Sequence, residues 1–189
     1  MDICFPKKNP EKFISIAKKL EKKELYLVYP YQKNISRLRS NIDKLQKKTN
    51  TILKLGLLAS PKDIIKAKKL SDFIITESTS KDQHVLEKLK PSLIFNLEKS
   101  PKKDRPHYRY SGLNQVLCKL AAKNNVVIGF AFSELLNSSK KPIIMGRMMQ
   151  NIRFCKKYNC KVLIGSFAKS PFELRSDKQL QSIKRLLER

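Results

Sequence analysis

The chain has 189 residues, of which 41% are hydrophobic, so it is long enough to bury the core of one domain. Its 41 Lys and Arg residues far outnumber its 16 Asp and Glu residues, which gives a formal net charge of +25. A folded domain this basic repels itself unless a polyanion neutralises it. A thermophile's charged surface would raise Lys and Glu together, so the composition favours a nucleic-acid partner over an incidental surface charge.

The four cysteines argue against both a disulfide framework and a zinc site. Cys4, Cys118, Cys155 and Cys160 form no CxxC pair, and only His84 and His107 could join them as metal ligands. The first residues lack the apolar core of a signal peptide, and no apolar run approaches the ~20 residues that span a bilayer. We therefore expect a reduced, cytoplasmic protein without a bound metal and without a membrane partner.

The first half of the chain repeats a buried strand followed by an amphipathic helix. Asn9 and Ser60 each precede a proline at an expected helix start, which is the pattern of an N-cap residue followed by a suitable first helical residue. The strands are continuously apolar rather than alternating. The predicted strands are 3–5, 25–29, 52–59, 72–76 and 92–95, and the predicted helices are 10–20, 34–48, 61–70 and 81–90.

Residues 97–111 interrupt this rhythm with a long basic segment. A connection of this length without an apolar period is usually functional or disordered. Basic residues interleaved with flat rings suit RNA, which offers phosphates and exposed base faces. A solvated surface loop is the alternative. The segment contains Lys99, Lys102, Lys103, Arg105, His107, Tyr108, Arg109 and Tyr110.

The second half resumes with a helix that Ser111 is expected to cap, a strand at 126–130 and a short helical turn at 133–136. A longer helix at 143–158 follows, then a strand at 162–165 and a last helix with a capping box at Ser176. The helix at 143–158 has an apolar face of Met145, Met148, Met149, Ile152 and Cys155. The other face of this helix is expected to point toward solvent. It carries Arg147, Gln150, Asn151, Arg153, Lys156 and Lys157.

Apolar strands separated by amphipathic helices are typical of a parallel sheet covered by helices. About seven strand–helix units are countable, one short of a closed eight-stranded barrel. The pattern therefore predicts an α/β fold, a TIM-barrel-like (βα) repeat, in one domain spanning 1–189. Either a strand is hidden, with 131–144 the place to look, or the barrel is incomplete or distorted at its C-terminal end.

No catalytic residue is predicted from the sequence. A parallel barrel carries its chemistry at the carboxyl ends of its strands, and neither His84 nor His107 falls directly at a strand end. Nucleophile-elbow, GxGxxG and Walker patterns are missing from the sequence. The expected strand ends offer helix-start amides beside Ser, Lys and Arg side chains, which bind phosphate rather than break bonds.

Four stretches resemble one family. In order, SGLNQVL at 111–117, GFAFSELLN at 129–137, GRMMQNIRFCKKY at 146–158 and IGSFAKSPFELRS at 164–176 are similar to archaeal ribonuclease P protein component 3. That family is related to the thirty-kilodalton protein subunit of eukaryotic ribonuclease P. Gln115 and Tyr110 depart from the family pattern, which bears on local RNA contacts.

The resemblance implies a ribonucleoprotein subunit that helps a catalytic RNA remove the 5′ leader of precursor tRNA. The implied partners are the ribonuclease P RNA, precursor tRNA indirectly, component 2 above all, and the other small subunits. The chain alone is expected to be inactive, because convergent acids and histidines are missing from its expected strand ends. It is expected to bind no cofactor, with the Mg²⁺ bound by the catalytic RNA.

Two other functions are weighed against this one. The first is a metallophosphoesterase-like barrel that hydrolyses a small phosphorylated substrate. Barrels of that kind carry an HxH pair after the first strand, where this chain has Cys4-Phe5-Pro6. The second is a protein–protein adaptor whose charge is incidental.

The predicted RNA-binding residues lie in three stretches. Arg105 and Arg109 belong to the basic segment, Arg147, Arg153, Lys156 and Lys157 to the helix at 143–158, and Ser166, Lys169 and Arg175 to the loop after the seventh strand. The sharpest hypothesis is that the last three converge on one phosphate, with the Arg175 guanidinium holding two of its oxygens. The alternative is that Arg175 pairs with Glu173 or Asp177 at the surface.

Overall fold

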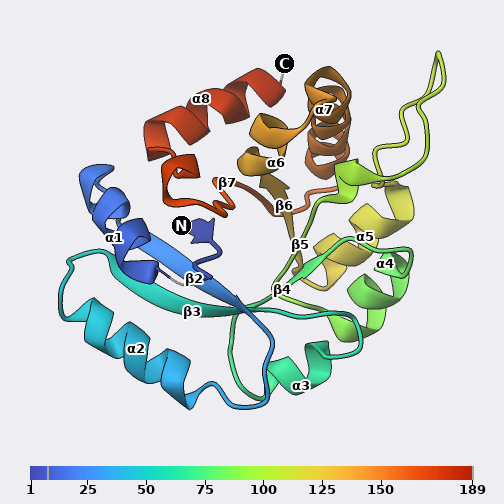
Figure 1. The fold of residues 1–189 in the computed structure, drawn as a ribbon. Coiled ribbons are helices and arrows are strands. Elements are labelled where there is room, and N and C mark those ends of the chain that lie inside the picture. The colour runs from blue at the N-terminus through green and yellow to red at the C-terminus, as the bar shows by residue number, and fades with distance from the viewer. Residues whose placement is uncertain (8, 189) are drawn as a thin grey trace.

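The computed structural model describes residues 1–7 and 9–188, and at its centre lies one sheet of seven parallel strands in sequence order. Figure 1 shows the sheet curving into a barrel with helices around it, which confirms the predicted fold class. That residues 1–189 form a single domain stays a prediction. The strands are β1 Asp2–Cys4, β2 Glu24–Pro30, β3 Ile52–Leu58, β4 Ile74–Glu77, β5 Leu93–Phe95, β6 Val127–Ala131 and β7 Val162–Gly165.

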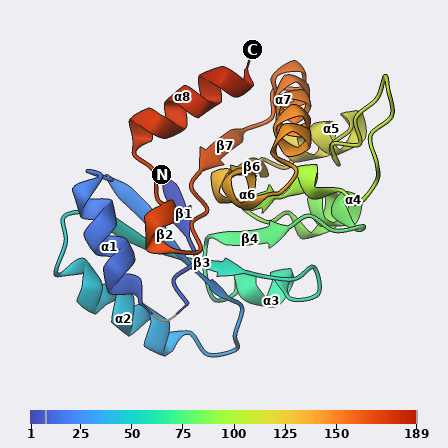
Figure 2. The ribbon, with the colours of Figure 1, turned by 45° about the horizontal axis from the view of Figure 1, so that its top comes forward.

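Helices join consecutive strands and form the outer ring, in which α8 lies between α7 and α1 (Figures 1 and 2). The segment after β4 is a short α-helix that continues as a π-helix, η1. No described helix combines the length and the apolar character of a membrane span. The helical elements are α1 Pro10–Lys19, α2 Ser36–Gln46, α3 Ile64–Lys68, α4 Asp82–His84, η1 Val85–Leu89, η2 Leu97–Lys99, α5 Gln115–Lys123, α6 Phe132–Asn137, α7 Lys141–Lys157, η3 Pro171–Glu173 and α8 Asp177–Leu187.

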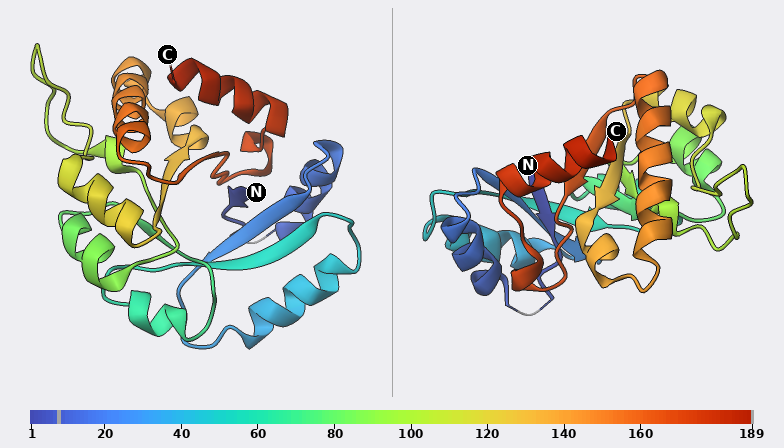
Figure 3. Two further views of the ribbon diagram at one scale, coloured as in Figure 1. Left: turned by 180° about the vertical axis from the view of Figure 1, so that it is seen from behind. Right: turned by 90° about the horizontal axis from the view of Figure 1, so that it is seen from above.

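The barrel is incomplete at its seam rather than short of a hidden strand. Between Ala131 and Ile144 the chain forms α6 and the start of α7, so the expectation of a strand there is wrong. The seam lies between β7 and β1, where a bridge joins Cys4 to Ala168, beyond the end of β7. The Phe5 N–H donates to the Ala168 carbonyl at 2.8 Å. Figure 3 shows the two ends of the sheet from behind and from above.

A buried ionic network holds the seam. The Asp2 carboxylate is fully buried and accepts hydrogen bonds from the Ser166 N–H and hydroxyl, both at 2.7 Å. The Lys22 ammonium, 3% exposed, lies 2.9 Å from Asp2 and 2.6 Å from Asp177 at the start of α8. Since a buried charge is tolerated only when it is paired, this network fixes β1, α8 and the loop after β7 together.

Alternate residues of each strand face two different cores. Leu93 and Phe95 of β5 belong to a cluster inside the barrel, whereas Ile94 between them packs under the helices. β4 follows the same rule, with Ile75 inside and Ile74 outside. Because both faces of β4 and β5 are buried, these strands carry the continuous apolar runs that predicted a parallel sheet.

The helix starts agree only in part with the predicted caps. The capping box at Ser176 is confirmed by reciprocal hydrogen bonds with Gln179. The prediction that Ser111 caps the next helix is wrong, because Asn114 accepts the hydrogen bond from the Leu117 N–H and α5 begins at Gln115. Asn9 occupies the N-cap position of α1 without a side-chain hydrogen bond to the helix.

Candidate RNA interface

The carboxyl end of the barrel, where barrel enzymes carry their chemistry, is filled by phenyl rings. Phe5 follows β1, Phe95 ends β5 and Phe167 follows β7, with the rings of Phe95 and Phe167 5.1 Å apart. Gly129 of β6 makes room for them, since a Cβ there would lie 2.9 Å from the Phe167 ring. The inside of the barrel at this end is therefore apolar.

The rim around these rings carries lysines that neutralise carboxylates. The Lys99 ammonium lies 3.1 Å from Glu134 and 3.9 Å from Glu77, and Lys169 pairs with Glu134 as well. Burial acts to raise the pKa of Glu134, but hydrogen bonds from the two lysines outweigh it and hold that pKa below its usual value. In the described part of the chain, no three His, Cys, Asp or Glu side chains are placed to hold a metal ion.

The basic segment after β5 is anchored to α7 by Arg147. Its guanidinium donates to the Asp104 carboxylate at 2.8 and 2.9 Å. It also donates to three backbone carbonyls, those of Glu98 at 3.0 Å, Ser100 at 2.7 Å and Lys102 at 2.5 Å. Burial alone would raise the pKa of Asp104, but the hydrogen bonds from Arg147 and from the Tyr110 N–H outweigh it and lower the pKa.

The predicted outward position of Arg147 is therefore wrong, as is that of Asn151. Arg147 is 5% exposed and Asn151 is fully buried, with its amide donating to the Ser111 carbonyl at 2.8 Å. Helical periodicity correctly separates these residues from the apolar face of α7, but it cannot foresee that the basic segment folds back over them. The Arg147 side chain is committed to the protein and positions the loop; a direct RNA contact would require it to leave these partners.

The outer part of the basic segment projects from the barrel beside α7 (Figure 1). Arg105 and Tyr108 pair through their backbones, with N···O distances of 2.8 and 3.2 Å. The Arg105 guanidinium lies 5.9 Å from the centre of the Tyr110 ring. Arg109 is exposed, and its guanidinium packs over Gly146 of α7. A Cβ at position 146 would lie 2.3 Å from the Arg109 guanidinium. The structure thus brings Arg105 and Arg109 together with aromatic rings on one projecting loop.

Three other predicted residues lie at the far end of α7. Arg153, Lys156 and Lys157 are exposed near its C-terminus. At 1.5 Å per residue, Lys156 and Lys157 lie roughly 15 Å along the helix from Arg147. They form a surface separate from the projecting loop.

The loop after β7 does not present the predicted phosphate site. Ser166 is fully buried, donates its hydroxyl to Asp2 and accepts from the Arg175 N–H at 3.0 Å. The Lys169 ammonium is paired with Glu134. A phosphate could reach Ser166 only if the seam network opened, so convergence of these residues on one phosphate would require these contacts to break and stays a prediction.

Arg175 also follows neither predicted arrangement. Its guanidinium donates to the carbonyls of Phe172 at 2.8 Å and Leu174 at 2.9 Å, and it lies 5.8 Å from the centre of the Phe132 ring. The predicted alternative partners are engaged elsewhere: Glu173 accepts from the Lys169 N–H and Asp177 from Lys22. Arg175 therefore closes the turn at η3.

The structure reveals a second basic surface at the opposite end of the barrel. Since all strands are parallel, every connection from a helix to the next strand lies at the amino end of the sheet. Each of these connections, or the last turn before it, carries an exposed lysine with no ion pair in the described chain: Lys23, Lys47, Lys69, Lys90, Lys123 and Lys161. The positive charge of Lys90 helps to lower the pKa of Lys68, after the larger effect of burial.

Most of this surface was not predicted from the sequence, although the lysines that form it recur at regular places in the sequence. A lysine follows each amphipathic stretch, where a cation also complements the helix dipole. Because that explanation suffices for each lysine alone, only the parallel topology shows that all of them share one end of the barrel.

No family model matches the chain, but curated relatives do. The chain is 38% identical over 77 residues to the ribonuclease P protein component 3 of Methanosarcina acetivorans, which is 40% of this chain and 32% of that protein. It is 35% identical over 74 residues to the protein of the same name from Thermococcus kodakarensis, which is 38% of this chain and 34% of that one. These matches confirm the resemblance inferred from the four stretches, and they span about a third of the relatives' length.

Two solved structures share the fold. One is a chain in the cryo-EM structure of archaeal ribonuclease P with mature tRNA, with a TM-score of 0.81 and 19% identity over 99% of this chain and 82% of that one. The other is histidinol phosphate phosphatase from Lactococcus lactis in complex with zinc, L-histidinol and phosphate. Its TM-score is 0.73 at 12% identity, over 98% of this chain and 91% of that one. At these identities, the likeness establishes the barrel fold alone.

Proposed function

We propose that this chain is a protein subunit of ribonuclease P that helps a catalytic RNA remove the 5′ leader from precursor tRNA. The observation that carries the proposal is the 77-residue stretch that is 38% identical to a ribonuclease P protein component 3. The net charge of +25 supports an RNA partner, and the chain would act in the cytoplasm.

In this proposal the RNA carries the catalysis and binds the Mg²⁺. The packed Phe5, Phe95 and Phe167 rings and the paired lysines at the carboxyl end of the barrel support this division of labour. A hydrolytic centre needs converging acid, base or metal ligands, whereas Glu77 and Glu134 are neutralised by ammonium groups.

The proposed partners are the ribonuclease P RNA, precursor tRNA indirectly, component 2 and the other small protein subunits. The projecting loop with Arg105 and Arg109 and the lysines at the amino end are the surfaces we assign to RNA. Arg153, Lys156 and Lys157 extend the second surface along α7.

A reconstitution assay tests the function. The catalytic RNA and the other protein subunits are combined with and without this chain, and cleavage of precursor tRNA is measured. We expect cleavage to rise when the chain is added and the chain alone to show no cleavage, because its described residues form no cluster able to hold a catalytic metal ion.

The control is the chain unfolded by heat and added at the same concentration. Unchanged cleavage on addition of the folded chain would contradict the subunit role. Mg²⁺-dependent cleavage by the chain in RNase-free preparations without the RNA would contradict the division of labour.

The likeness to a zinc-bound phosphatase supports one alternative, a hydrolase of a small phosphorylated substrate. The apolar carboxyl end and the Lys99 pairings fit it poorly. Metal analysis of the purified protein separates the two functions, since the hydrolase needs bound divalent cations and the ribonuclease P subunit needs none.

A further inference from the structure

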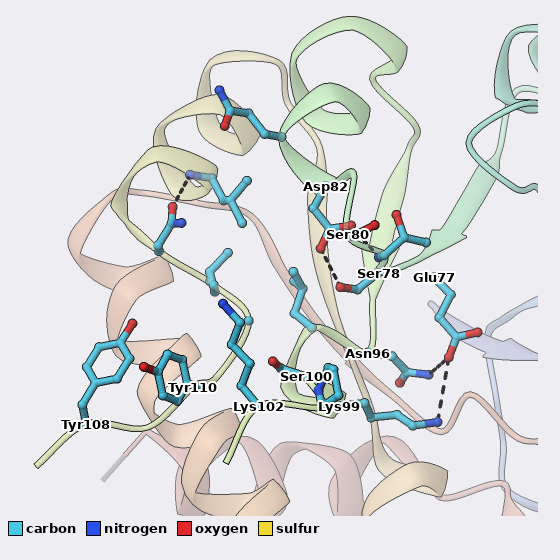
Figure 4. A pocket seen from close by; sticks show the side chains of 18 residues that line it. Glu77, Ser78, Ser80, Asp82, Asn96, Lys99, Ser100, Lys102, Tyr108 and Tyr110 are labelled. Carbon is cyan, nitrogen blue, oxygen red and sulfur yellow. Dashed lines mark hydrogen bonds and ion pairs between the residues drawn. The ribbon is translucent and has the colours of Figure 1, made fainter. Parts of the chain in front are cut away.

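A cleft opens between the loop after β4 and the basic segment after β5. It has a volume of about 780 Å³, which is in the range of small-molecule sites. Figure 4 shows hydroxyl and amide side chains on one side and Tyr108, Tyr110 and Lys102 on the other. These groups suit a ligand that is flat and carries polar edges.

Two local arrangements hold the cleft open. Gly112 has a φ of +79°, and a Cβ there would lie 2.0 Å from the Leu97 carbonyl oxygen, so only glycine permits this close approach of the returning loop. On the other wall, the buried Asp82 carboxylate accepts from the Ser78 hydroxyl at 2.5 Å and the Thr79 N–H at 2.7 Å. Both walls are therefore fixed before any ligand binds.

The cleft contains one buried acceptor without a donor. Asn96 is 4% exposed and donates its amide N–H to Glu77 at 2.7 Å, but its Oδ1 has no hydrogen-bond partner in the described chain. Buried polar atoms are nearly always paired, so this atom indicates a ligand that brings an N–H or O–H donor. The phosphodiester of a nucleic acid offers only acceptors and does not fit here, whereas the pairing edges of nucleobases carry N–H donors.

The aromatic and basic side chains complement that donor. Tyr108 is 49% exposed, and its ring meets that of Tyr110 edge-on at 4.9 Å. The Lys102 ammonium lies 5.5 Å from the centre of the Tyr110 ring and has no ion pair among the described residues. An open ring beside a free cation is the arrangement that binds a stacked base and its phosphate.

We propose that this cleft binds a single unpaired nucleotide of RNA. This proposal rests on the RNA partner proposed above. The base stacks on Tyr108 and donates to Asn96 Oδ1, and its phosphate lies at the rim on Lys102. A duplex does not fit, because its bases are already stacked and paired. The Asp82 carboxylate in the lining disfavours a phosphate in the interior.

The test measures binding of the whole chain to a fluorescein-labelled single-stranded RNA of eight nucleotides and to a duplex of equal length, by anisotropy. We expect Tyr108→Ala to weaken single-strand binding by at least about fivefold, as loss of one stacked base does. Tyr108→Phe keeps the ring and should bind the single strand as wild type does. The duplex affinity of both variants should stay within about twofold of the wild-type value.

Phe172→Ala is the matched control, because Phe172 is 83% exposed on another loop and its removal should change neither affinity. Photo-crosslinking with 5-iodouridine in the same octamer should label Tyr108 or Tyr110. No binding of the single strand, equal effects of Tyr108→Ala and Phe172→Ala, or crosslinks confined to other loops would overturn the assignment.

Assembly and cleavage assays keep this inference apart from the proposed function. If Tyr108→Ala impairs assembly with the purified protein subunits but not octamer binding, the cleft takes a protein side chain and the inference fails. If the wild-type chain stimulates precursor-tRNA cleavage but Tyr108→Ala binds the octamer as tightly as wild type, the inference fails and the subunit role stands.

Discussion

At the scale of single residues, Glu98 is the least compensated group in the described chain. It is fully buried in η2, and neither carboxylate oxygen has a hydrogen-bond partner among the described residues. Its pKa is raised to about 7, mainly by burial, with the nearby Glu134 charge acting in the same direction and the backbone at Glu98 and the Lys99 charge acting against it. In the folded protein Glu98 therefore keeps its proton up to a higher pH than an exposed glutamate does.

Glu98→Gln should make the protein less sensitive to rising pH. The pKa of Glu98 rises from 4.5 to about 7 on folding, so its contribution to stability is present below pH 4.5 and is lost as pH rises toward 7. The loss is on the order of 3 kcal/mol, at about 1.4 kcal/mol per pKa unit. Gln mimics the protonated acid, so the variant should unfold at higher denaturant concentration than wild type at pH 8.

Denaturant unfolding at pH 5 and pH 8 gives the comparison, with Glu87→Gln as the control because Glu87 is exposed. The control should keep the wild-type pH dependence. A Glu98→Gln variant whose stability falls between pH 5 and 8 as steeply as wild type would contradict the assigned protonation.

At the scale of elements, the basic segment is held in place by one side chain of α7. Arg147 supplies five hydrogen bonds to residues 98–104. Of the three backbone carbonyls among its partners, those of Ser100 and Lys102 lie outside regular secondary structure and that of Glu98 lies in the short η2. The path of the loop, and with it Arg105, Arg109 and Tyr108, depends on this anchor.

Arg147→Met should loosen the basic segment while leaving the barrel folded. Methionine keeps the apolar stem but leaves carbonyls and the Asp104 carboxylate without their donor, a cost of about 2–4 kcal/mol. Hydrogen exchange should speed up at residues 98–111, and the strands should keep their protection.

Lys156→Met is the control, since Lys156 is exposed on the same helix and has no ion pair in the described chain. It should leave exchange in the loop unchanged. Equal protection of residues 98–111 in wild type and Arg147→Met would show that the loop is held by other contacts.

At the scale of the whole molecule, positive charge is spread over two ends of the barrel. At the carboxyl end, Lys99 and Lys169 are paired with Glu77 and Glu134. The lysines at the helix-to-strand connections have no such partners within the described residues, and the parallel topology gathers their positive charge at one end of the barrel.

Binding to RNA should weaken steeply with salt, because lysines on phosphates release counterions. Replacing the six connection lysines, Lys23, Lys47, Lys69, Lys90, Lys123 and Lys161, by Gln should reduce the slope of log K against log salt. The expected reduction is about 0.7–0.9 for each lysine that contacts a phosphate, measured by titration between low and moderate ionic strength.

A variant of equal net charge serves as the control, with Gln at six exposed lysines of the carboxyl end: Lys7, Lys33, Lys62, Lys81, Lys140 and Lys141. This control variant should reduce the slope of log K against log salt less than replacement of the six connection lysines does. A flat salt response of the wild type would mean that its charge of +25 is a solvated surface, and equal slopes in both variants would mean that only net charge matters.

Local sequence could predict these elements because a buried strand and an amphipathic helix each impose a period on the chain. The runs at Ile3, Leu25 and Val162 lie in the strands that their apolar character predicts, and Ser176 caps its helix as its spacing with Gln179 indicates. The site was less predictable. Arg147 lies on an amphipathic helix and Arg105 in a polar segment, and only contacts distant in sequence make the first an anchor and leave the second exposed.

The sequence by itself determined the order of strands and helices, the parallel barrel class, the excess of positive charge and the resemblance at residues 111–176. These properties depend on residue type and on spacing over a few turns. Only the tertiary structure decided that Ser166 closes the seam with Asp2, that Asn96 leaves an acceptor in a cleft, and that the connection lysines share one end. The reason is physical: burial and pairing depend on segments up to 164 positions apart, and no local pattern records which of them meet.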